Sequence, residues 1–162
     1  MAVEIERKFL VSNDDWRHLD DGSELTGVPF RQGYIPTEGM TTVRVRLEGN
    51  KAKLTIKGKN QGLSRAEFEY AIPLSDAEQM LDNLCARPLI EKTRYFRSEA
   101  GLTWEIDVFE GDNTGLVVAE VELQSEDQQV DLPHWLGQEV SEDPRYYNVN
   151  LVVNPYCNWR QA

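Results

Sequence analysis

Polar and apolar residues alternate along most of the chain with a period of two, which is typical of β-strands that face different surroundings on their two sides. Many of the apolar positions hold Val, Ile, Phe or Tyr, residues that favour strands. Residues 28–35 are a candidate strand, and the pattern is clearer in seven further segments, residues 2–11, 41–48, 51–58, 64–73, 90–98, 102–110 and 115–124.

Short connections join several of these segments. Residues 48–50, 58–62, 99–101 and 111–115 each contain glycine and have the lengths expected of hairpins rather than of helical crossovers. The sequence therefore predicts a mainly antiparallel sheet. A sheet of seven or eight such strands tends to curl and close, and closure places one face of every strand in a common lumen.

Helical signals are few. An acid three residues after Ser75 has capping-box spacing, and apolar side chains follow on one face, which predicts a short helix over 76–84. The Asp143–Pro144 step fits the start of a second helix that runs to about Val153. Two weaker segments are 13–19, a candidate helix, and 125–137, a connection over the sheet. The predicted class is α+β and β-dominated, a closed barrel flanked by a few short helices.

Composition places this fold in one domain over residues 1–162, since 40% hydrophobic residues suffice for one core. The 28 acidic and 17 basic residues give a net charge of −11, which repels duplex DNA and anionic membranes. No apolar run approaches the ~18 residues of a membrane span, and the first eight residues carry acids where a signal peptide is basic. We expect a cytoplasmic protein without nucleic-acid or membrane partners.

The chain has two cysteines, Cys85 and Cys157, and lacks a Cys-x-x-Cys motif or a nearby histidine at metal-ligand spacing. Neither a disulfide framework nor a zinc site is therefore indicated, and we expect two buried free thiols. His18 and His134 have no evident partner, which favours surface or packing roles. The four scattered tryptophans are expected to pack in the core.

Paired charges recur on the predicted strands. Two carboxylates at positions i and i+2 of a strand point to the same face, about 6 to 7 Å apart. The acidic pairs are Glu4 with Glu6, Glu67 with Glu69, Glu105 with Asp107, and Glu120 with Glu122, and the basic groups are Arg44 with Arg46, Lys53 with Lys57, and Lys92 with Arg94. For any single pair, a solvated face of an amphipathic strand is the simpler explanation.

Taken together, the pairs predict a ligand if their faces line the lumen of a closed barrel. Isolated buried charges cost many kcal/mol, so such a lumen has to be wet and occupied. Carboxylate clusters suit Mg²⁺ and Mn²⁺, whereas Arg and Lys clusters suit phosphate oxygens. Both sets in one lumen indicate a metal-bound, linear polyphosphate.

The same residues resemble the motifs of the CYTH superfamily, the triphosphate tunnel metalloenzymes. The segment Glu4-Ile-Glu6-Arg-Lys8 is similar to the family signature Glu-x-Glu-x-Lys. Further matches follow in the order of the family at residues 31–34, 44–46, 54–57, 62–69, 91–95, 105–109, 120–122 and 139–148. The chain most resembles the short, stand-alone bacterial members that act on inorganic triphosphate, and this resemblance implies an eight-stranded antiparallel tunnel.

The resemblance also implies roles for individual residues. One divalent metal ion, Mg²⁺ or Mn²⁺, would be bound by Glu4, Glu6 and a carboxylate of the pair Glu120 and Glu122. A second ion or the attacking water would be placed by Glu67, Glu69 and Asp107, with Glu105 evenly balanced between a direct and an orienting role. Phosphate oxygens would be bound by Lys8, Arg44, Arg46, Lys57, Lys92, Arg94 and Arg145, and Tyr34 would face the tunnel.

The implied reaction is hydrolysis of inorganic triphosphate to pyrophosphate and phosphate. Phosphoryl transfer depends mainly on positioning and electrostatic stabilisation, and Lys8 would stabilise the charge that develops on the leaving pyrophosphate. We expect direct attack by water because no Cys, Ser–His or histidine nucleophile arrangement is apparent.

Other functions occur on the same fold. The rivals are hydrolysis of an organic triphosphate such as thiamine triphosphate or a nucleoside triphosphate, a class IV adenylate cyclase reaction, and non-catalytic binding of polyphosphate. The first two need recognition of an organic group at the tunnel mouth, and no sequence feature is committed to it. The many acids argue against the third, since they weaken anion binding unless metal ions occupy them. An open-ended barrel with exposed Trp and Tyr could also pair as a homodimer.

Overall fold

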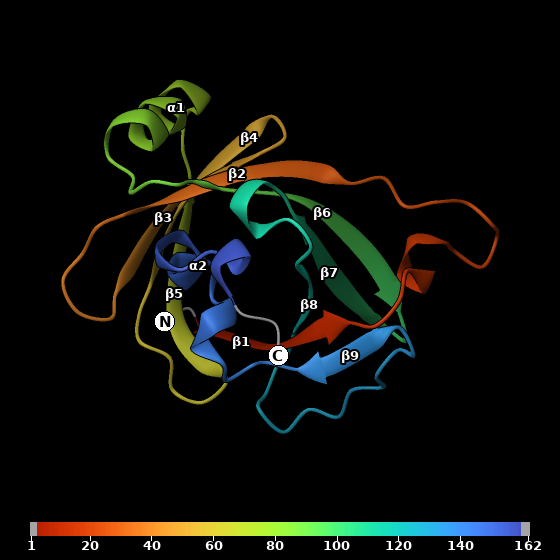
Figure 1. Ribbon diagram of the computed structural model, residues 1–162. Coiled ribbons are helices and arrows are strands. Elements are labelled where there is room, and N and C mark those ends of the chain that lie inside the picture. Colours follow the sequence, from red (N-terminus) through yellow and green to blue (C-terminus); the bar gives the residue numbers. More distant parts are fainter. Residues whose placement is uncertain (1–2, 160–162) are drawn as a thin grey trace.

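A closed antiparallel β-barrel dominates the computed structural model, which describes residues 3–159 (Figure 1). Eight strands follow one another in the order β5, β4, β3, β2, β6, β7, β8, β1, and β1 pairs with β5 to close the barrel. Their bounds are β1 Val3–Val11, β2 Val28–Ile35, β3 Thr42–Glu48, β4 Lys51–Lys57, β5 Ser64–Ala71, β6 Ile90–Glu99, β7 Leu102–Phe109 and β8 Val117–Glu122. The predicted fold class and all eight strands are confirmed, and the predicted strand start at residue 2 lies outside the described residues.

A ninth strand, β9 (Leu136–Glu139), was expected to be part of a connection. It pairs with the end of β1, where the register shifts between Phe9 and Val11. Its sequence, Leu-Gly-Gln-Glu, has too few apolar residues to show alternation. The pairing is reinforced by Glu139, whose carboxylate accepts hydrogen bonds from the Arg7 guanidinium at 2.7 and 2.9 Å.

Helix α1 (Leu74–Asn83) packs outside the barrel against β3 and β4. The predicted helix is confirmed, but its expected start at 76 was two residues too late. Pro73 is the N-cap residue, and Ser75 lies inside the first turn without a capping role. The buried residues Ala77 and Leu81 cover the outward-facing Val45 and Ala52. Because the barrel's outer face is apolar here, the helix is needed to shield it from water.

The C-terminal segment covers one end of the barrel. A 3₁₀ turn over Pro144–Tyr146 precedes helix α2 (Asn148–Val153). The expected continuous helix was wrong, because Tyr147 between the two is extended, with φ −70° and ψ 131°. The cap by Asp143 is confirmed: its carboxylate accepts from the amide of Arg145 at 3.1 Å. The segment predicted at 13–19 is helical only as a 3₁₀ turn over Asp15–Arg17.

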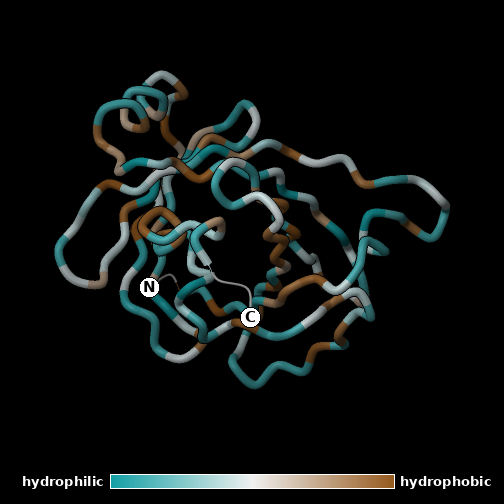
Figure 2. The backbone as a smooth tube through the Cα atoms, in the orientation of Figure 1, coloured by the Kyte–Doolittle hydropathy of each residue, from teal (hydrophilic) through white to brown (hydrophobic). Residues whose placement is uncertain are grey.

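Apolar side chains from α2 and from the inner faces of several strands form the cluster that closes this end. Leu151 and Val152 pack with Ile90, Phe109 and Val118. Figure 2 shows hydrophobic stretches in α2 and β8, in contrast to the mainly hydrophilic long loop between β1 and β2. Apolar side chains therefore fill the interior of the barrel at the end that the C-terminal segment covers.

A second cluster lies on the outer face of β1, β7 and β8. It contains three fully buried tryptophans, Trp16, Trp104 and Trp135, which confirms their packing role. The fourth, Trp159, is only half-buried and packs against the cluster that contains Leu151. The histidines His18 and His134 are exposed, as expected. The expected burial of both thiols was wrong, because Cys157 is exposed and Cys85 is only half-buried. None of the helices within residues 3–159 has the length and apolar character that membrane crossing requires.

Leu151→Ala is expected to lower the free energy of unfolding by about 3 kcal/mol, because it leaves a cavity in the closing cluster. Leu151 is fully buried, whereas Val153 on the same helix is 84% exposed. Urea titration of both alanine variants checks this, with a change below about 0.5 kcal/mol expected for Val153→Ala. Equal effects would show that α2 is not anchored through its buried face.

Candidate active site

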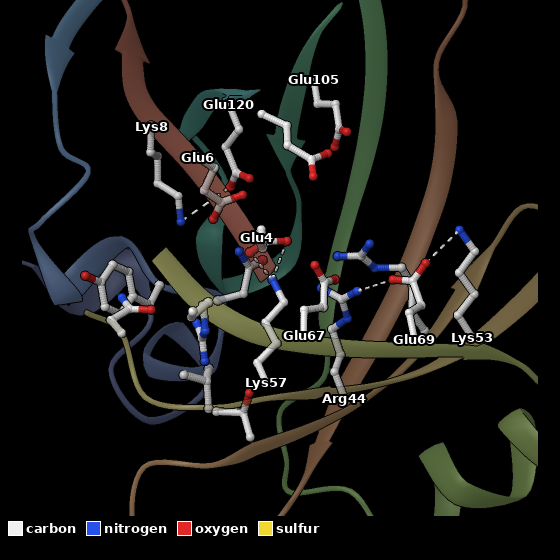
Figure 3. Close-up of a pocket in the computed structure, with 18 of the residues that line it drawn as sticks. Glu4, Glu6, Lys8, Arg44, Lys53, Lys57, Glu67, Glu69, Glu105 and Glu120 are labelled. Atoms are coloured by element: carbon white, nitrogen blue, oxygen red, sulfur yellow. Dashed lines mark hydrogen bonds and ion pairs between the residues drawn. The ribbon is translucent and has the colours of Figure 1, made fainter. Parts of the chain in front are cut away.

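The barrel encloses a cavity of about 630 Å³ whose wall is mainly charged (Figure 3). Its cations are Lys8, Arg44, Arg46, Lys53, Lys57, Arg65 and Arg94. Its carboxylates are Glu4, Glu6, Glu48, Glu67, Glu69, Glu105, Glu120 and Glu122. The charged strand faces therefore point inward, an orientation that the alternation pattern itself left open.

Twelve of the fifteen predicted site residues line this cavity. They are Glu4, Glu6, Lys8, Tyr34, Arg44, Arg46, Lys57, Glu67, Glu69, Arg94, Glu120 and Glu122. Lys92 and Asp107 are buried beside Arg94. Arg145 lies elsewhere: its side chain is 59% exposed, pairs with Asp143 at 2.8 Å, and contacts the ring of Trp159. Arg145 is thus not among the residues that line the cavity.

Crowded carboxylates occupy one side of the cavity. Glu6 lies near Lys8 and Glu120, as Figure 3 shows. Burial raises the pKa of Glu6 well above 4.5, and the negative charges of Glu120 and Glu4 raise it further. Burial also acts to raise the pKa of Glu120, but Lys8 at 3.4 Å and Arg94 outweigh it and lower the pKa to about 2. Glu6 is thus left without a sufficient counter-charge.

Glu4 and Glu67 form a second crowded pair. The ammonium group of Lys57 donates to both oxygens of Glu4 at 2.8 and 3.1 Å and, against the effect of burial, lowers the pKa of Glu4. Burial, followed by its hydrogen bond with Glu4, raises the pKa of Glu67 to about 7. The carboxyl groups of Glu4 and Glu67 therefore share the positive charge of Lys57.

These carboxylates fit a divalent cation. Within residues 3–159, no three acidic, His or Cys side chains already form a complete metal-binding group. Mg²⁺ and Mn²⁺ nevertheless keep several waters and need only one or two carboxylates. A divalent ion beside Glu4, Glu6, Glu120 and Glu122 would supply the positive charge that Glu6 lacks.

Cations line the wall between β3 and β5. Arg44 donates to the hydroxyl of Thr55 at 3.1 Å, and that hydroxyl donates to Glu69 at 3.2 Å. Arg44 also has a buried Nε–H group that finds no hydrogen-bond acceptor in the described part of the chain. A buried donor without an acceptor is costly, so the hydrogen-bonding capacity of Arg44 is only partly satisfied.

Lys92, Arg94 and Asp107 form a buried triad at the wall. One oxygen of Asp107 accepts from Arg94 at 2.7 Å, and the other accepts from Lys92 at 2.7 Å and from Arg94 at 2.9 Å. A second carboxylate, Glu105, lies 2.5 Å from Arg94. Burial, together with repulsion from Arg94 and Arg46, lowers the pKa of Lys92 to about 7, although the negative charge of Asp107 acts to raise it. Both carboxylate oxygens of Asp107 therefore accept hydrogen bonds from buried cations.

Several cavity residues were not among the predicted site residues. Lys53 lies 3.3 Å from both Glu48 and Glu69, and its place in the alternation of β4 was the signal that could have identified it. Arg65 lines the cavity two residues before Glu67. Asn148 lines the cavity and accepts from Lys92 at 3.1 Å, and the buried Gln32 donates to Asn148 at 3.4 Å. Both residues are uncharged, so charge patterning could not reveal them.

Comparisons with known proteins place these residues in a family context. The family model for the CYTH domain matches residues 2–153. An inorganic triphosphatase of Acetivibrio thermocellus is 48% identical over 161 residues, which cover 99% of this chain and 100% of that protein. One of Nitrosomonas europaea is 41% identical over 157 residues, covering 94% and 98%. A solved structure of an inorganic triphosphatase has a TM-score of 0.65 and 38% identity, and covers 93% of this chain and 97% of that one.

Asp107→Asn is expected to lower the free energy of unfolding by ~3 kcal/mol at pH 7, because two buried cations lose their counter-charge. Burial acts to raise the pKa of Asp107, but the two cations outweigh it and hold this pKa far below its ordinary value of 3.8. A depressed carboxyl pKa stabilises the folded state above the unfolded pKa, and this contribution is lost as the pH falls towards the folded pKa. The difference between wild type and variant should therefore shrink below about pH 4.

Urea titrations from pH 2.5 to 8 measure this difference, with Asp112→Asn on an exposed turn as the matched control. An Asp107 that served mainly as a metal ligand would instead be replaceable by Asn without loss of stability in the metal-free protein.

Proposed function

The chain belongs to the CYTH domain family, and from this premise we propose that it hydrolyses inorganic triphosphate to pyrophosphate and phosphate with divalent metal ions. The observation that carries the proposal is the cavity wall, where seven cations and eight carboxylates face one enclosed space. Both relatives at 41% and 48% identity are inorganic triphosphatases and align over nearly their whole length.

The basic residues bind the phosphate chain. We assign this role to Lys8, Arg44, Arg46, Lys57 and Arg94 of the predicted set, with Lys53 and Arg65 added from the cavity wall. Arginine donates to phosphate oxygens through two N–H groups at once, whereas lysine acts as a point charge. The place of Arg44 in the cavity wall, beside Thr55 and Glu69, supports this role.

The acidic residues hold the metal ions, for which Mg²⁺ and Mn²⁺ are both suitable and two ions are proposed. Glu4, Glu6, Glu120 and Glu122 would bind the ion that clamps the triphosphate, and Glu67 with Glu69 would bind or face the second. When bound, such ions neutralise charge on the phosphoryl oxygens and favour ionisation of water.

The chain's own residues complete the hydrolysis. Glu67 and Glu69 orient a water molecule so that its oxygen bonds to a terminal phosphorus while the bond to the bridging oxygen breaks, and the carboxylate of Glu67 accepts the proton that the water releases. Lys8 faces the bridging oxygen and stabilises the negative charge that pyrophosphate acquires. Asp107, expected as a catalytic metal ligand, is assigned a positioning role instead, since both its oxygens accept from Lys92 and Arg94. The pairing of two barrels stays a prediction.

Inorganic triphosphate is expected to be the preferred substrate in a phosphate-release assay that includes ATP, GTP and thiamine triphosphate with Mg²⁺ or Mn²⁺. Cation-rich walls recognise the phosphate chain, and no organic group is needed for those contacts. Tripolyphosphate should also raise the melting temperature of the protein, since it binds only the folded state. Cyclic AMP formation from ATP, or selective release of phosphate from one organic substrate, would contradict the proposal.

Glu6→Gln is expected to reduce turnover by about two orders of magnitude or more, because the metal-binding group loses a charge. The same variant should melt about 3 °C higher, since the uncompensated repulsion around Glu6 disappears. Glu91→Gln, on the outer face of β6 with a side chain 54% exposed, is the matched control for both measurements. A Glu6 variant that melts lower and keeps its turnover would assign Glu6 a structural role.

A further inference from the structure

One aromatic side chain lies in the charged wall. Phe30 on β2 lines the cavity and is 4% exposed. Buried phenylalanines usually pack among apolar side chains. Within residues 3–159, however, Phe30 belongs to none of the three buried apolar clusters. Packing in a hydrophobic core therefore does not explain why Phe30 is buried.

The neighbours of the Phe30 ring are two guanidinium groups. The central carbon of Arg46 lies 4.9 Å from the ring centroid and that of Arg94 lies 4.7 Å from it. A cation within about 6 Å of an aromatic ring is attracted to the electron-rich face. One ring thus contacts two of the cations to which phosphate binding is assigned.

Strand register explains the arrangement. In the sheet, β2 lies between β3 and β6 (Figure 1). Phe30 is directly opposite Glu48 on β3 and Lys92 on β6. Arg46 lies two residues before Glu48, and Arg94 lies two residues after Lys92. Diagonal neighbours at this spacing are within reach of an aromatic and a long side chain. Phe30 is consequently placed to contact an arginine from each adjacent strand.

The two arginines need such a contact because they repel each other. Arg94 is compensated by Asp107 and Glu105, whereas Arg46 has Glu48 at 3.3 Å and the neutral Gln32, which accepts from its Nε at 2.7 Å. Burial, followed by repulsion from Arg44 and Arg94, lowers the pKa of Arg46 to about 9. An aromatic face attracts both cations without accepting from their N–H groups, so the N–H groups that Asp107, Glu105, Glu48 and Gln32 do not already occupy stay available to an anion.

We propose that Phe30 is a positioning residue, whose ring holds the guanidinium groups of Arg46 and Arg94 at the cavity wall so that their remaining N–H groups meet the oxygens of a linear inorganic phosphate chain. This role rests on the proposed function. It predicts that the electron density of the ring, and not only its volume, determines affinity for the phosphate chain. Gln32 acts with it, since its carbonyl oxygen fixes the Nε of the same Arg46.

The test replaces Phe30 by site-specific incorporation of 4-fluoro-, 3,5-difluoro- and 3,4,5-trifluorophenylalanine, which withdraw density from the ring with little change in volume. Affinity for tripolyphosphate, measured by calorimetry, and kcat/KM with the divalent ion are expected to fall steadily along the series. The loss should reach about tenfold at the trifluoro residue, because two cation–π contacts weaken together. It should appear mainly in KM, since the contacts form with the substrate bound and in the transition state alike.

Phe68 provides the matched control. It lies on the outer face of β5, is 41% exposed, and does not line the cavity, so the same fluorinated series there should leave affinity and kcat/KM unchanged. Phe30→Leu keeps an apolar side chain without a π face and should lose about as much affinity as the trifluoro residue. Thermal melts confirm that each variant is folded.

The outcomes separate this proposal from the proposed function. Constant affinity across the Phe30 series, with wild-type hydrolysis of tripolyphosphate intact, would overturn the positioning role alone. A wild-type protein that does not hydrolyse tripolyphosphate would overturn the proposed function, and calorimetry of the same series would then still decide whether the ring positions the arginines for phosphate binding.

Discussion

Charge balance inside a closed barrel is the constraint on which the other features depend. The strand register places Lys8 opposite Glu120, Lys57 opposite Glu67, and Arg94 opposite Asp107. Each cross-strand pair offsets part of the desolvation cost that burial imposes on its members. The groups left incompletely compensated, Glu6 and Arg46 above all, are then the groups with most to gain from a ligand.

An inward-facing set of charges reverses the usual arrangement of a small barrel. Because the lumen is polar, apolar residues of the strands face outward and must be covered by other parts of the chain. Helix α1 covers β3 and β4, while the 3₁₀ turn at Trp16 and the segment around Trp135 cover β1, β7 and β8. Two of the three buried apolar clusters within residues 3–159 thus lie outside the barrel and the third closes one end, which leaves the rest of the interior free to meet the electrostatic demands of a ligand.

Most of the fold could be predicted because alternation is strong in the eight barrel strands. The pattern could not say which face is internal, and only the resemblance of the charged motifs to a family resolved that choice. β9 was missed since Leu-Gly-Gln-Glu carries no alternation. The break at Tyr147 was missed as well, and the contacts of its side chain with Ser141 and Lys8 are not visible in the local sequence. At the site, charge patterning found most of the ionic residues but not Arg65, Phe30 or Gln32. The roles of Phe30 and Gln32 follow from what surrounds them. Charge patterning also could not distinguish an acid that binds metal from one that holds cations, as Asp107 does.

The three partners of β1 also set the order in which the chain can fold. Residues 3–5 pair with β5, residues 6–10 with β8, and the end of the strand with β9. During synthesis, β1 emerges before all three of its partners and must wait for residues 117–139 before the sheet can close, and such distant pairings are slow to form. The same alternation that lines the lumen gives this waiting strand Glu4, Glu6 and Lys8, charges that oppose edge-to-edge aggregation until its neighbours arrive.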